Sequence, residues 1–170
     1  MTAYVALLRA VNVGGQLLKM EDLKQLAVKL GLGSPKTFIA SGNLLFTSDR
    51  AERELKADLE AAIAAHMGKP IGVMVRTADE MAAVAVANPF ADQPGNRVVA
   101  IFLDDAPPKD AAETAKNVAD EALALGAREI YVHYPSGQGQ SKLRIPAATA
   151  GTARNMNSVA RLAELAKEME

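Results

Sequence analysis

The sequence has no cysteine, no tryptophan and no long hydrophobic run. Without cysteine the chain forms no disulfide, no thiolate metal site and no cysteine nucleophile, which fits a reducing cytoplasm. An early apolar stretch at residues 4–13 is interrupted by Arg9 and Asn12 and is stopped by Gly14-Gly15. Such a stretch is too short for a membrane span or a signal peptide. We therefore expect a buried first strand in a cytoplasmic protein.

Net charge and aromatic residues are scarce as well. The formal net charge is -1 at pH 7, and only 4% of the residues are aromatic. The chain therefore lacks both the overall positive field and the many aromatic rings that are typical of nucleic-acid-binding proteins. Hydrophobic residues make up 49% of the chain, which is enough for a real core, and nothing in the composition indicates disorder. Since domains cluster at about 100–150 residues, the 170 residues fit one domain or two small ones.

The first part of the chain alternates between the patterns of strands and helices. Asp49 and Glu52 have the spacing of a capping box, and Gly68 is placed to end the helix that they open. The expected elements are a strand at 4–10, a helix at 21–32, strands at 36–40 and 44–47, a helix opened by the Asp49 capping box and closed by Gly68, and a strand at 71–76. This order, βαββαβ, is that of a ferredoxin-like fold, in which two helices cover one face of an antiparallel sheet.

The second part of the chain repeats most of this order. Thr77 and Glu80 form another capping box, and their short helix stops at Asn88-Pro89, because the residue before proline avoids helical geometry. A polar link at 91–97 predicts a boundary between two halves, residues 1–90 and 91–170. Beyond it we expect a strand at 98–103, a long Ala-rich helix at 107–126, strands at 129–134 and 141–145, and a final helix from 155. We therefore predict an α+β protein with a duplicated ferredoxin-like fold, whose second copy is incomplete because its last strand is missing.

Five short segments carry a resemblance to a known family. In chain order they are Leu8-Arg9-Ala10-Val11-Asn12-Val13-Gly14-Gly15, Lys19-Met20-x-x-Leu23, Ser41-Gly42-Asn43, Asn88-Pro89-Phe90 and Thr152-Ala153-Arg154-Asn155-Met156-Asn157-Ser158-Val159. Together they resemble bacterial domain-of-unknown-function family 1697. The resemblance implies a duplicated ferredoxin-like fold and no established activity. Ala10, Ala153 and Met156 depart from the residues typical of the family, which are Gly, Thr and Trp, and Met156 removes an aromatic ring that a ligand could stack on.

Gly14-Gly15 follows a predicted strand and precedes a predicted helix, with Lys19 a few residues later. Glycines in such a loop let backbone N–H groups point together, and the helix start adds partial positive charge, so the loop suits an anion. The pattern is neither a Walker A motif nor G-x-G-x-x-G. The alternative is that the glycines only form a turn that needs positive φ angles.

The segment 152–158 enters the last predicted helix and is rich in polar side chains. Arg154 offers the planar fork of donors that suits phosphate or carboxylate, and Asn155, Asn157 and Ser158 lie beside it. The alternative is that Thr152 or Asn155 caps the helix while Arg154 pairs with a carboxylate at the surface.

Single polar residues in the predicted strands and turns also have two interpretations. Arg9 and Arg76 lie in or at the ends of predicted apolar strands. Because a buried unpaired charge is costly, each is expected to contact a ligand, to reach solvent or to pair with an acid. Ser41 and Asn43 flank Gly42, where they either contact a ligand or bond to the local backbone of a turn.

No residue pattern points to catalysis. His66 and His133 lack a metal-ligand partner at a recognisable spacing, and no G-x-S-x-G elbow is present. Asp104-Asp105 precedes Ala-Pro-Pro and is best interpreted as a turn. We therefore expect neither a metal nor a cofactor, and the sequence does not decide whether the protein is an enzyme.

The two helix entries together give the functional prediction. We predict a small anionic ligand, a nucleotide or a phosphorylated metabolite, held between the Gly14-Gly15 loop and the N-terminus of the last helix. Binding of RNA or single-stranded DNA, and self-assembly through an unfilled sheet edge, are the alternatives. The predicted ligand-binding residues are Arg9, Asn12, Gly14, Gly15, Lys19, Ser41, Asn43, Arg154, Asn155 and Asn157.

Overall fold

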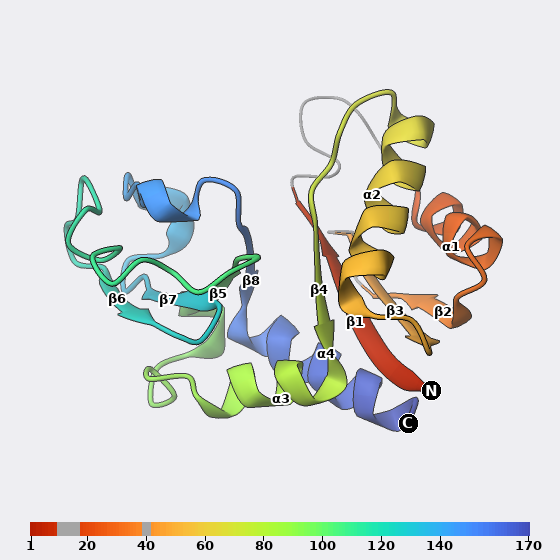
Figure 1. Cartoon of the computed structure of the whole chain (residues 1–170). Helices are drawn as coiled ribbons and strands as arrows, with labels where there is room; N and C mark the ends of the chain where they lie inside the picture. Colours follow the sequence, from red (N-terminus) through yellow and green to blue (C-terminus); the bar gives the residue numbers. More distant parts are fainter. Residues whose placement is uncertain (10–17, 39–41) are drawn as a thin grey trace. The chain divides into compact units, whose positions relative to one another are not determined.

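The computed structural model describes residues 1–9, 18–38 and 42–170 (Figure 1). The chain forms two compact units. Unit 1 consists of Met1–Met81 and Leu162–Glu170, and unit 2 consists of Ala82–Arg161. The sequence placed the boundary between residues 90 and 91, whereas here it falls at residue 81 and the end of the chain returns to unit 1.

Unit 1 contains a four-stranded antiparallel sheet in the order β2-β3-β1-β4. Its elements are β1 (Thr2–Leu8), α1 (Met20–Lys29), β2 (Gly33–Thr37), β3 (Asn43–Ser48), α2 (Glu52–Met67) and β4 (Val73–Thr77). This βαββαβ order and this strand arrangement are those of a ferredoxin-like fold. The order of elements predicted for this half is confirmed.

The core of unit 1 lies between the sheet and the helices α1 and α2, which cover one face of the sheet (Figure 1). On α2 the fully buried residues are Leu55, Leu59 and Ile63, which recur every four positions and therefore share one face of the helix. They pack in one cluster with Tyr4 and Phe46 of the central strands. Gly68 ends α2 with a left-handed φ of 73°, as the sequence predicts.

Two predicted details of unit 1 are wrong. The pair Asp49 and Glu52 forms no capping box, because the N-cap of α2 is Ala51 and makes no side-chain cap bond. Asp49 Oδ1 instead lies 3.8 Å from the N-terminal ammonium of Met1. This ion pair joins residues far apart in the chain, so the spacing of nearby residues does not predict it. The strand predicted at 36–40 is β2, which starts three residues earlier at Gly33 and pairs with β3 through a register shift.

Unit 2 contains a second four-stranded antiparallel sheet, in the equivalent order β6-β7-β5-β8. Its strands are β5 (Val98–Phe102), β6 (Ala122–Leu125), β7 (Glu129–His133) and β8 (Thr152–Asn155). Short 3-10 turns occur at η1 (Gly95–Arg97), η2 (Gln138–Gln140) and η3 (Pro146–Ala148). The fold is thus a duplicated ferredoxin-like α+β fold with an incomplete second copy, as predicted, although the missing parts differ from the prediction.

The long helix predicted at 107–126 is wrong. Residues 103–121, all described, form turns and one isolated bridge between Lys116 and Arg144, and Ala122–Leu125 form β6. Helix propensity of an Ala-rich stretch is a weak preference that tertiary pairing overrides. Here β7 offers β6 a partner strand, and Asn117 breaks helical geometry with a φ of 59°.

The fourth strand of unit 2 is present. We expected it to be missing, because residues 152–155 looked like the entry to the last helix, but they form β8 and pair with β5. The strand predicted at 141–145 contributes only the bridge at Arg144. What the second copy lacks is its two covering helices, since residues 103–121 form turns and one bridge and residues 134–151 contain only η2 and η3.

A helix follows the last strand of each sheet. These are α3 (Ala78–Val86) after β4 and α4 (Met156–Glu168) after β8. The predicted capping box of α3 is confirmed: the Glu80 N–H donates to Thr77 Oγ1 at 3.1 Å, and the Thr77 N–H donates to Glu80 Oε1 at 2.8 Å. None of the helices in the described ranges combines the length and apolar character needed to cross a membrane.

Candidate functional site

Arg9 and Lys19 are the charged residues that bracket the Val-Gly-Gly segment. Arg9 lies just past the end of β1 and is exposed, so it reaches solvent rather than lying inside the strand. Its backbone N–H donates to Gly72 O at 2.8 Å, which fixes the place where the chain leaves the sheet. A Cβ at residue 72 would lie 3.8 Å from Arg9 Cβ and Cδ, which is ordinary van der Waals contact, so Arg9 packs beside Gly72 without requiring a glycine there.

Lys19 occupies the N-cap of α1 and is exposed, directly after the fully buried Leu18. It has an extended backbone with ψ of 140° and makes no side-chain cap bond. The first N–H groups of a helix have no partner within the helix and carry partial positive charge. Glu21 and Asp22 lie in this first turn, where they offset part of that charge. The start of α1 is thus a set of backbone donors beside an exposed ammonium.

Four of the predicted ligand-binding residues lie outside the described residues: Asn12, Gly14, Gly15 and Ser41. Asn43 is described and fully buried at the start of β3. Its Nδ2 donates to Phe38 O at 2.9 Å, and the Phe38 N–H donates to Asn43 O at 3.2 Å. These bonds close the turn between β2 and β3, so local turn chemistry accounts for Asn43.

The entry to α4 is built from strand β8 and a side-chain cap. Asn155 Oδ1 accepts a 2.9 Å hydrogen bond from the Ser158 N–H, as the capping interpretation of the sequence expects. Arg154 is 9% exposed, and its NH1 donates to Thr152 Oγ1 at 2.8 Å and to Ala153 O at 2.9 Å. Burial lowers the pKa of this guanidinium to about 10, which leaves it charged at neutral pH.

Asn157 is exposed in the first turn of α4, and its side chain covers Gly95. A Cβ at residue 95 would stand 2.1 Å from Asn157 Oδ1. The glycine therefore allows the close approach of η1 to α4, and Asn157 has a packing role within unit 2.

The sheets carry a repeat that the sequence prediction missed. Arg76 of β4 and Arg154 of β8 are both buried, and each precedes a capping residue and a helix. In each case NH1 donates to the carbonyl of the preceding residue, to Val75 O at 3.1 Å in unit 1 and to Ala153 O at 2.9 Å in unit 2. The shared pattern, Arg-cap-helix, is visible in the sequence only once the two last strands are aligned.

Unit 2 also contains a cavity of about 600 Å³ that the sequence did not indicate. Two hydroxyl–carboxylate bonds join its walls: Ser136 Oγ donates to Asp120 Oδ2 at 2.5 Å, and Ser141 Oγ donates to Glu121 Oε2 at 2.6 Å. The bond from Ser141, followed by that from the Ala119 N–H, lowers the pKa of the Glu121 carboxyl. The lining is Asn117, Val118, Ala119, Asp120, Glu121, Ser136, Gly137, Gln140, Ser141 and Lys142.

Each of the two histidines lies beside one neighbouring side chain. His66 Nε2 lies 3.7 Å from Asp22 Oδ2, and the His133 ring contacts the Phe90 ring at a centroid distance of 5.7 Å. Within the described ranges, no group of three or more His, Cys, Asp or Glu side chains is arranged to hold a metal ion.

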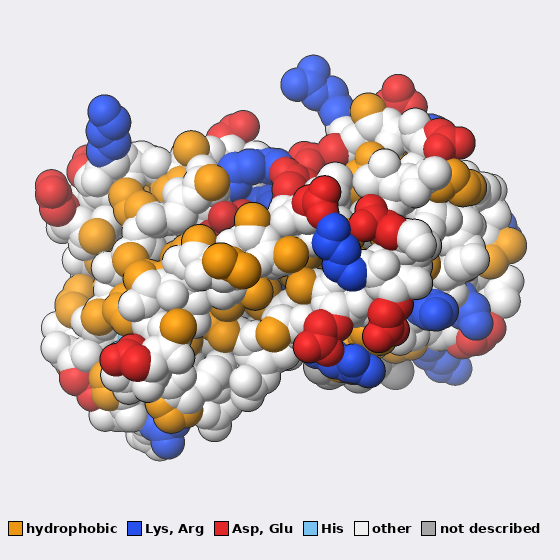
Figure 2. Space-filling view, turned by 90° about the horizontal axis from the view of Figure 1, so that it is seen from below, with side chains coloured by type: hydrophobic (Ala, Val, Ile, Leu, Met, Phe, Trp, Pro, Cys, Tyr) orange, Lys and Arg blue, Asp and Glu red, His pale blue; other side chains and the backbone are white. Residues whose placement is uncertain are grey.

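The aromatic side chains in the described ranges are largely covered. All four phenylalanines and three tyrosines lie in described ranges, and every one is buried or half-buried. Single-stranded nucleic acids are usually held by exposed rings on which bases stack. On the face shown in Figure 2, acidic and basic side chains are interspersed rather than gathered by sign.

Comparison with known proteins agrees with this fold and adds no activity. A family model described as "Protein of unknown function (DUF1697)" matches residues 1–131. Among solved structures the chain is similar to conserved bacterial protein SP0830 from Streptococcus pneumoniae, with 25% sequence identity and a TM-score of 0.80. That similarity covers 97% of this chain and 98% of the other. No curated protein matches the chain.

Proposed function

The chain belongs to the DUF1697 family of proteins of unknown function, and we propose that it binds a small anionic ligand at the start of α1. The ligand class is a nucleotide or a phosphorylated metabolite. The observation that carries the proposal is Lys19, an exposed cation at the N-cap of α1 that makes no side-chain cap bond.

Helix starts bind anions because their backbone donors and the helix dipole act together. In α3 these donors already have a partner, because Thr77 and Glu80 form a capping box, and in α4 Asn155 supplies the cap. The N-cap of α2 is Ala51, which makes no cap bond and brings no charge. At α1 the N-cap is a lysine, whose ammonium donates hydrogen bonds and accepts none. A phosphate group would satisfy both the ammonium and the backbone donors.

Two further features of the sequence support this place. Arg9 supplies an exposed guanidinium at the other end of the Val-Gly-Gly segment. Gly14 and Gly15 allow close approach of backbone to a ligand, because they have no Cβ. Asn12 and Ser41 belong to the same proposal on sequence grounds alone.

Arg154, Asn155 and Asn157 remain predicted contacts at the start of α4. Arg154 provides a charged donor there, and Asn157 is exposed. The cap made by Asn155 and the contact of Asn157 with Gly95 explain these two residues without a ligand. We therefore propose the start of α1 as the main binding site for the anion.

The alternatives receive less support. Nucleic-acid binding lacks exposed aromatic rings, since none of the seven Phe and Tyr side chains is exposed. Self-assembly was expected to fill a missing strand of unit 2, but β8 occupies that position.

Thermal unfolding with added inorganic phosphate, ATP or a sugar phosphate tests the proposal, because a ligand that binds only the folded state raises the Tm. We expect at least one of these anions to raise it. The variant Lys19→Ala should weaken binding about tenfold, the scale of one lost hydrogen bond to a charged group. Lys24→Ala removes an equally exposed lysine later on α1 and should leave binding unchanged. No stabilisation by any of the anions, or equal effects of the two variants, contradicts the proposal.

We also propose that the protein lies in the bacterial cytoplasm. The absence of cysteine fits a reducing compartment. Fractionation of cells that express the chain, with detection in the soluble cytoplasmic fraction, tests this placement.

A further inference from the structure

Strand β4 is the last strand of its sheet, and among the described residues no strand pairs with its outer side. The Arg9 N–H donates to Gly72 O toward β1, and the side of the strand that a backbone group faces alternates along a strand. The N–H and C=O groups of Val73, Val75 and Thr77 therefore point away from β1. Outward backbone groups of an edge strand invite pairing with another strand unless other groups bond to them.

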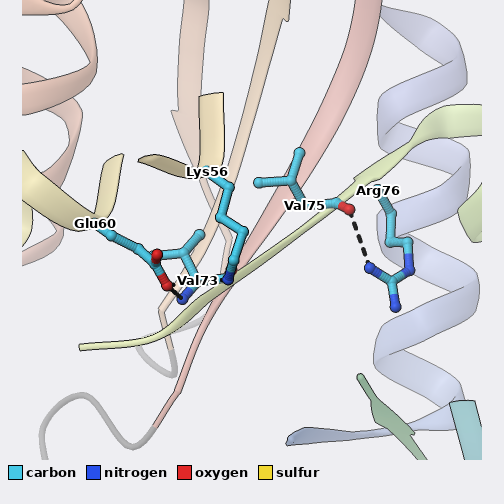
Figure 3. Close-up of polar contacts among 5 residues, drawn as sticks. All are labelled: Lys56, Glu60, Val73, Val75 and Arg76. Atoms are coloured by element: carbon cyan, nitrogen blue, oxygen red, sulfur yellow. Dashed lines mark hydrogen bonds and ion pairs between the residues drawn. The ribbon is translucent and has the colours of Figure 1, made fainter. Parts of the chain in front are cut away.

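Side chains of α2 occupy both outward groups of Val73. Glu60 Oε2 accepts a 2.9 Å hydrogen bond from the Val73 N–H, and Lys56 Nζ donates to Val73 O at 2.6 Å. Lys56 and Glu60 also pair with each other at 3.0 Å (Figure 3). Together the two side chains present to Val73 the donor and the acceptor that a neighbouring strand would present.

Two further outward groups along β4 are also bonded by side chains. Arg76 NH1 donates to Val75 O at 3.1 Å, and Glu80 Oε1 accepts the Thr77 N–H at 2.8 Å. Arg76 extends to the side of β4 opposite Lys56 and Glu60 (Figure 3). Four outward groups between Val73 and Thr77 are thus bonded by side chains from both sides of the strand.

We infer that Lys56, Glu60, Arg76 and Glu80 form an edge clamp, which keeps β4 from pairing with a strand of a second copy of this chain. Charged side chains at a sheet edge oppose strand addition, because an incoming strand must displace their bonds. It must also desolvate the partly exposed charges of Lys56 and Glu60, whereas Arg76 is already buried. The clamp lies within unit 1 and needs no ligand, so it is independent of the proposed anion site.

Other edges carry comparable devices, with one exception. In β2, Pro35 lacks an N–H and Ser34 has a φ of 48°, both of which disturb strand pairing. In β8, Arg154 bonds to Ala153 O as Arg76 does to Val75 O. Strand β6 has the sequence Ala-Leu-Ala-Leu and contains no charged residue or proline. Its edge is therefore protected only by the short length of the strand, which is 4 residues.

The variant Lys56→Ala/Glu60→Ala tests the inference through the molar mass in solution, measured by light scattering over a range of concentrations. We expect its mass to rise with concentration to at least twice that of the wild-type chain at the same concentration. Arg53→Ala/Glu54→Ala is the matched control, because it removes one cation and one anion from exposed positions on the same helix. A folded double variant whose mass follows that of the wild type and the control overturns the inference.

Amide hydrogen exchange gives a second test that does not need the variant to associate. Because Glu60 holds the Val73 N–H, that amide should be protected in the wild-type protein. Glu60→Ala should speed its exchange about ten- to a hundredfold, while the Met74 amide, which pairs with β1, stays protected. Equal exchange of the Val73 amide in the wild type and in Glu60→Ala overturns the clamp, and protection retained in Lys56→Arg, which keeps the donor, supports it.

Discussion

The two units share one strand order but cover their sheets differently. In unit 1, α1 and α2 cover the sheet, and their buried leucines and isoleucine complete a large aliphatic cluster. In unit 2 the equivalent face is covered by turns, with Ala111, Leu143 and Ile145 packed against β5 and β7. Antiparallel pairing thus maintains this strand order in both units, whereas the covering layer is helical in one and irregular in the other and buries the sheet in both.

The comparison extends to the helix entries. In α3 and α4 the first turn has a side-chain cap, from Thr77 with Glu80 and from Asn155. In α1 the corresponding position is Lys19, which provides no cap. Helix entries that follow the last strand of each sheet are thus closed by the chain itself, and the entry after β1 is the one that we propose for an anion.

The largest expected effect comes from removing the matched arginines. Arg76→Ala should lower the free energy of unfolding by about 3 kcal/mol or more, because it removes a buried stem and leaves Val75 O without this donor. Arg154→Ala should cost less, since Arg154 is 9% exposed and Arg76 only 1%. Urea unfolding followed by circular dichroism measures both. A larger loss for Arg154→Ala would show that the two positions are not equivalent.

Truncating one covering residue in each unit sharpens the comparison. Leu59→Ala on α2 should cost about 2–4 kcal/mol, because the side chain is fully buried and the helix cannot collapse into the space. Leu143→Ala should cost only about 1 kcal/mol, because Leu143 is half-buried in an irregular segment. The same unfolding measurement applies. Equal losses would indicate that the irregular cover of unit 2 is as tightly packed as the helices of unit 1.

A smaller effect is expected where the irregular cover meets the sheet. Gly151→Ala should cost about 1–3 kcal/mol, because its Cβ would lie 2.8 Å from Ile101 Cγ2 and 2.9 Å from Phe102 O. Gly139→Ala is the control, since no heavy atom lies within 4 Å of its added Cβ. Thermal unfolding of both variants checks the prediction. No difference between them would mean that the segment before β8 moves freely away from the sheet.

The smallest effect concerns pH and the cavity of unit 2. The Ser141 hydroxyl holds the pKa of the Glu121 carboxyl below its ordinary value, so Ser141→Ala should raise that pKa. A carboxyl with a lowered pKa stabilises the folded state above its unfolded pKa, and this contribution is lost as pH falls through the folded value. Carbon NMR titration of the Glu121 carboxyl measures the shift. Ser136→Ala, which loses a bond to Asp120 instead, should leave Glu121 unchanged, and a shift in both variants would contradict the assignment.

The parts of the fold that were predicted from the sequence depend on local patterns. Leu55, Leu59 and Ile63 share a helical face, and Thr77 with Glu80 forms a cap, because each depends only on spacing along the chain. The second half was harder. Its Ala-rich stretch has high helix propensity, but β7 draws residues 122–125 into a strand, and the chain sequence contains no signal for that pairing.

The candidate site was predictable only in part. Lys19 was named from the sequence, and the structure places it at the N-cap of α1. Asn43 was named as well, but it is buried in a turn, which its position beside a glycine does not distinguish from a ligand contact. The edge clamp was not foreseen, because Lys56 and Glu60 meet Val73 only through packing of α2 against the sheet.

The central claim is that an anion binds at the start of α1. Backbone amide NMR of the whole chain during titration with inorganic phosphate and with ATP tests it most directly. We predict shifts concentrated at the amides of residues 19–22 and at Gly14 and Gly15, with smaller or no shifts at Asn157 and Ser158. A titration that leaves the amides of residues 19–22 unchanged, or that moves only those at the start of α4, would contradict it.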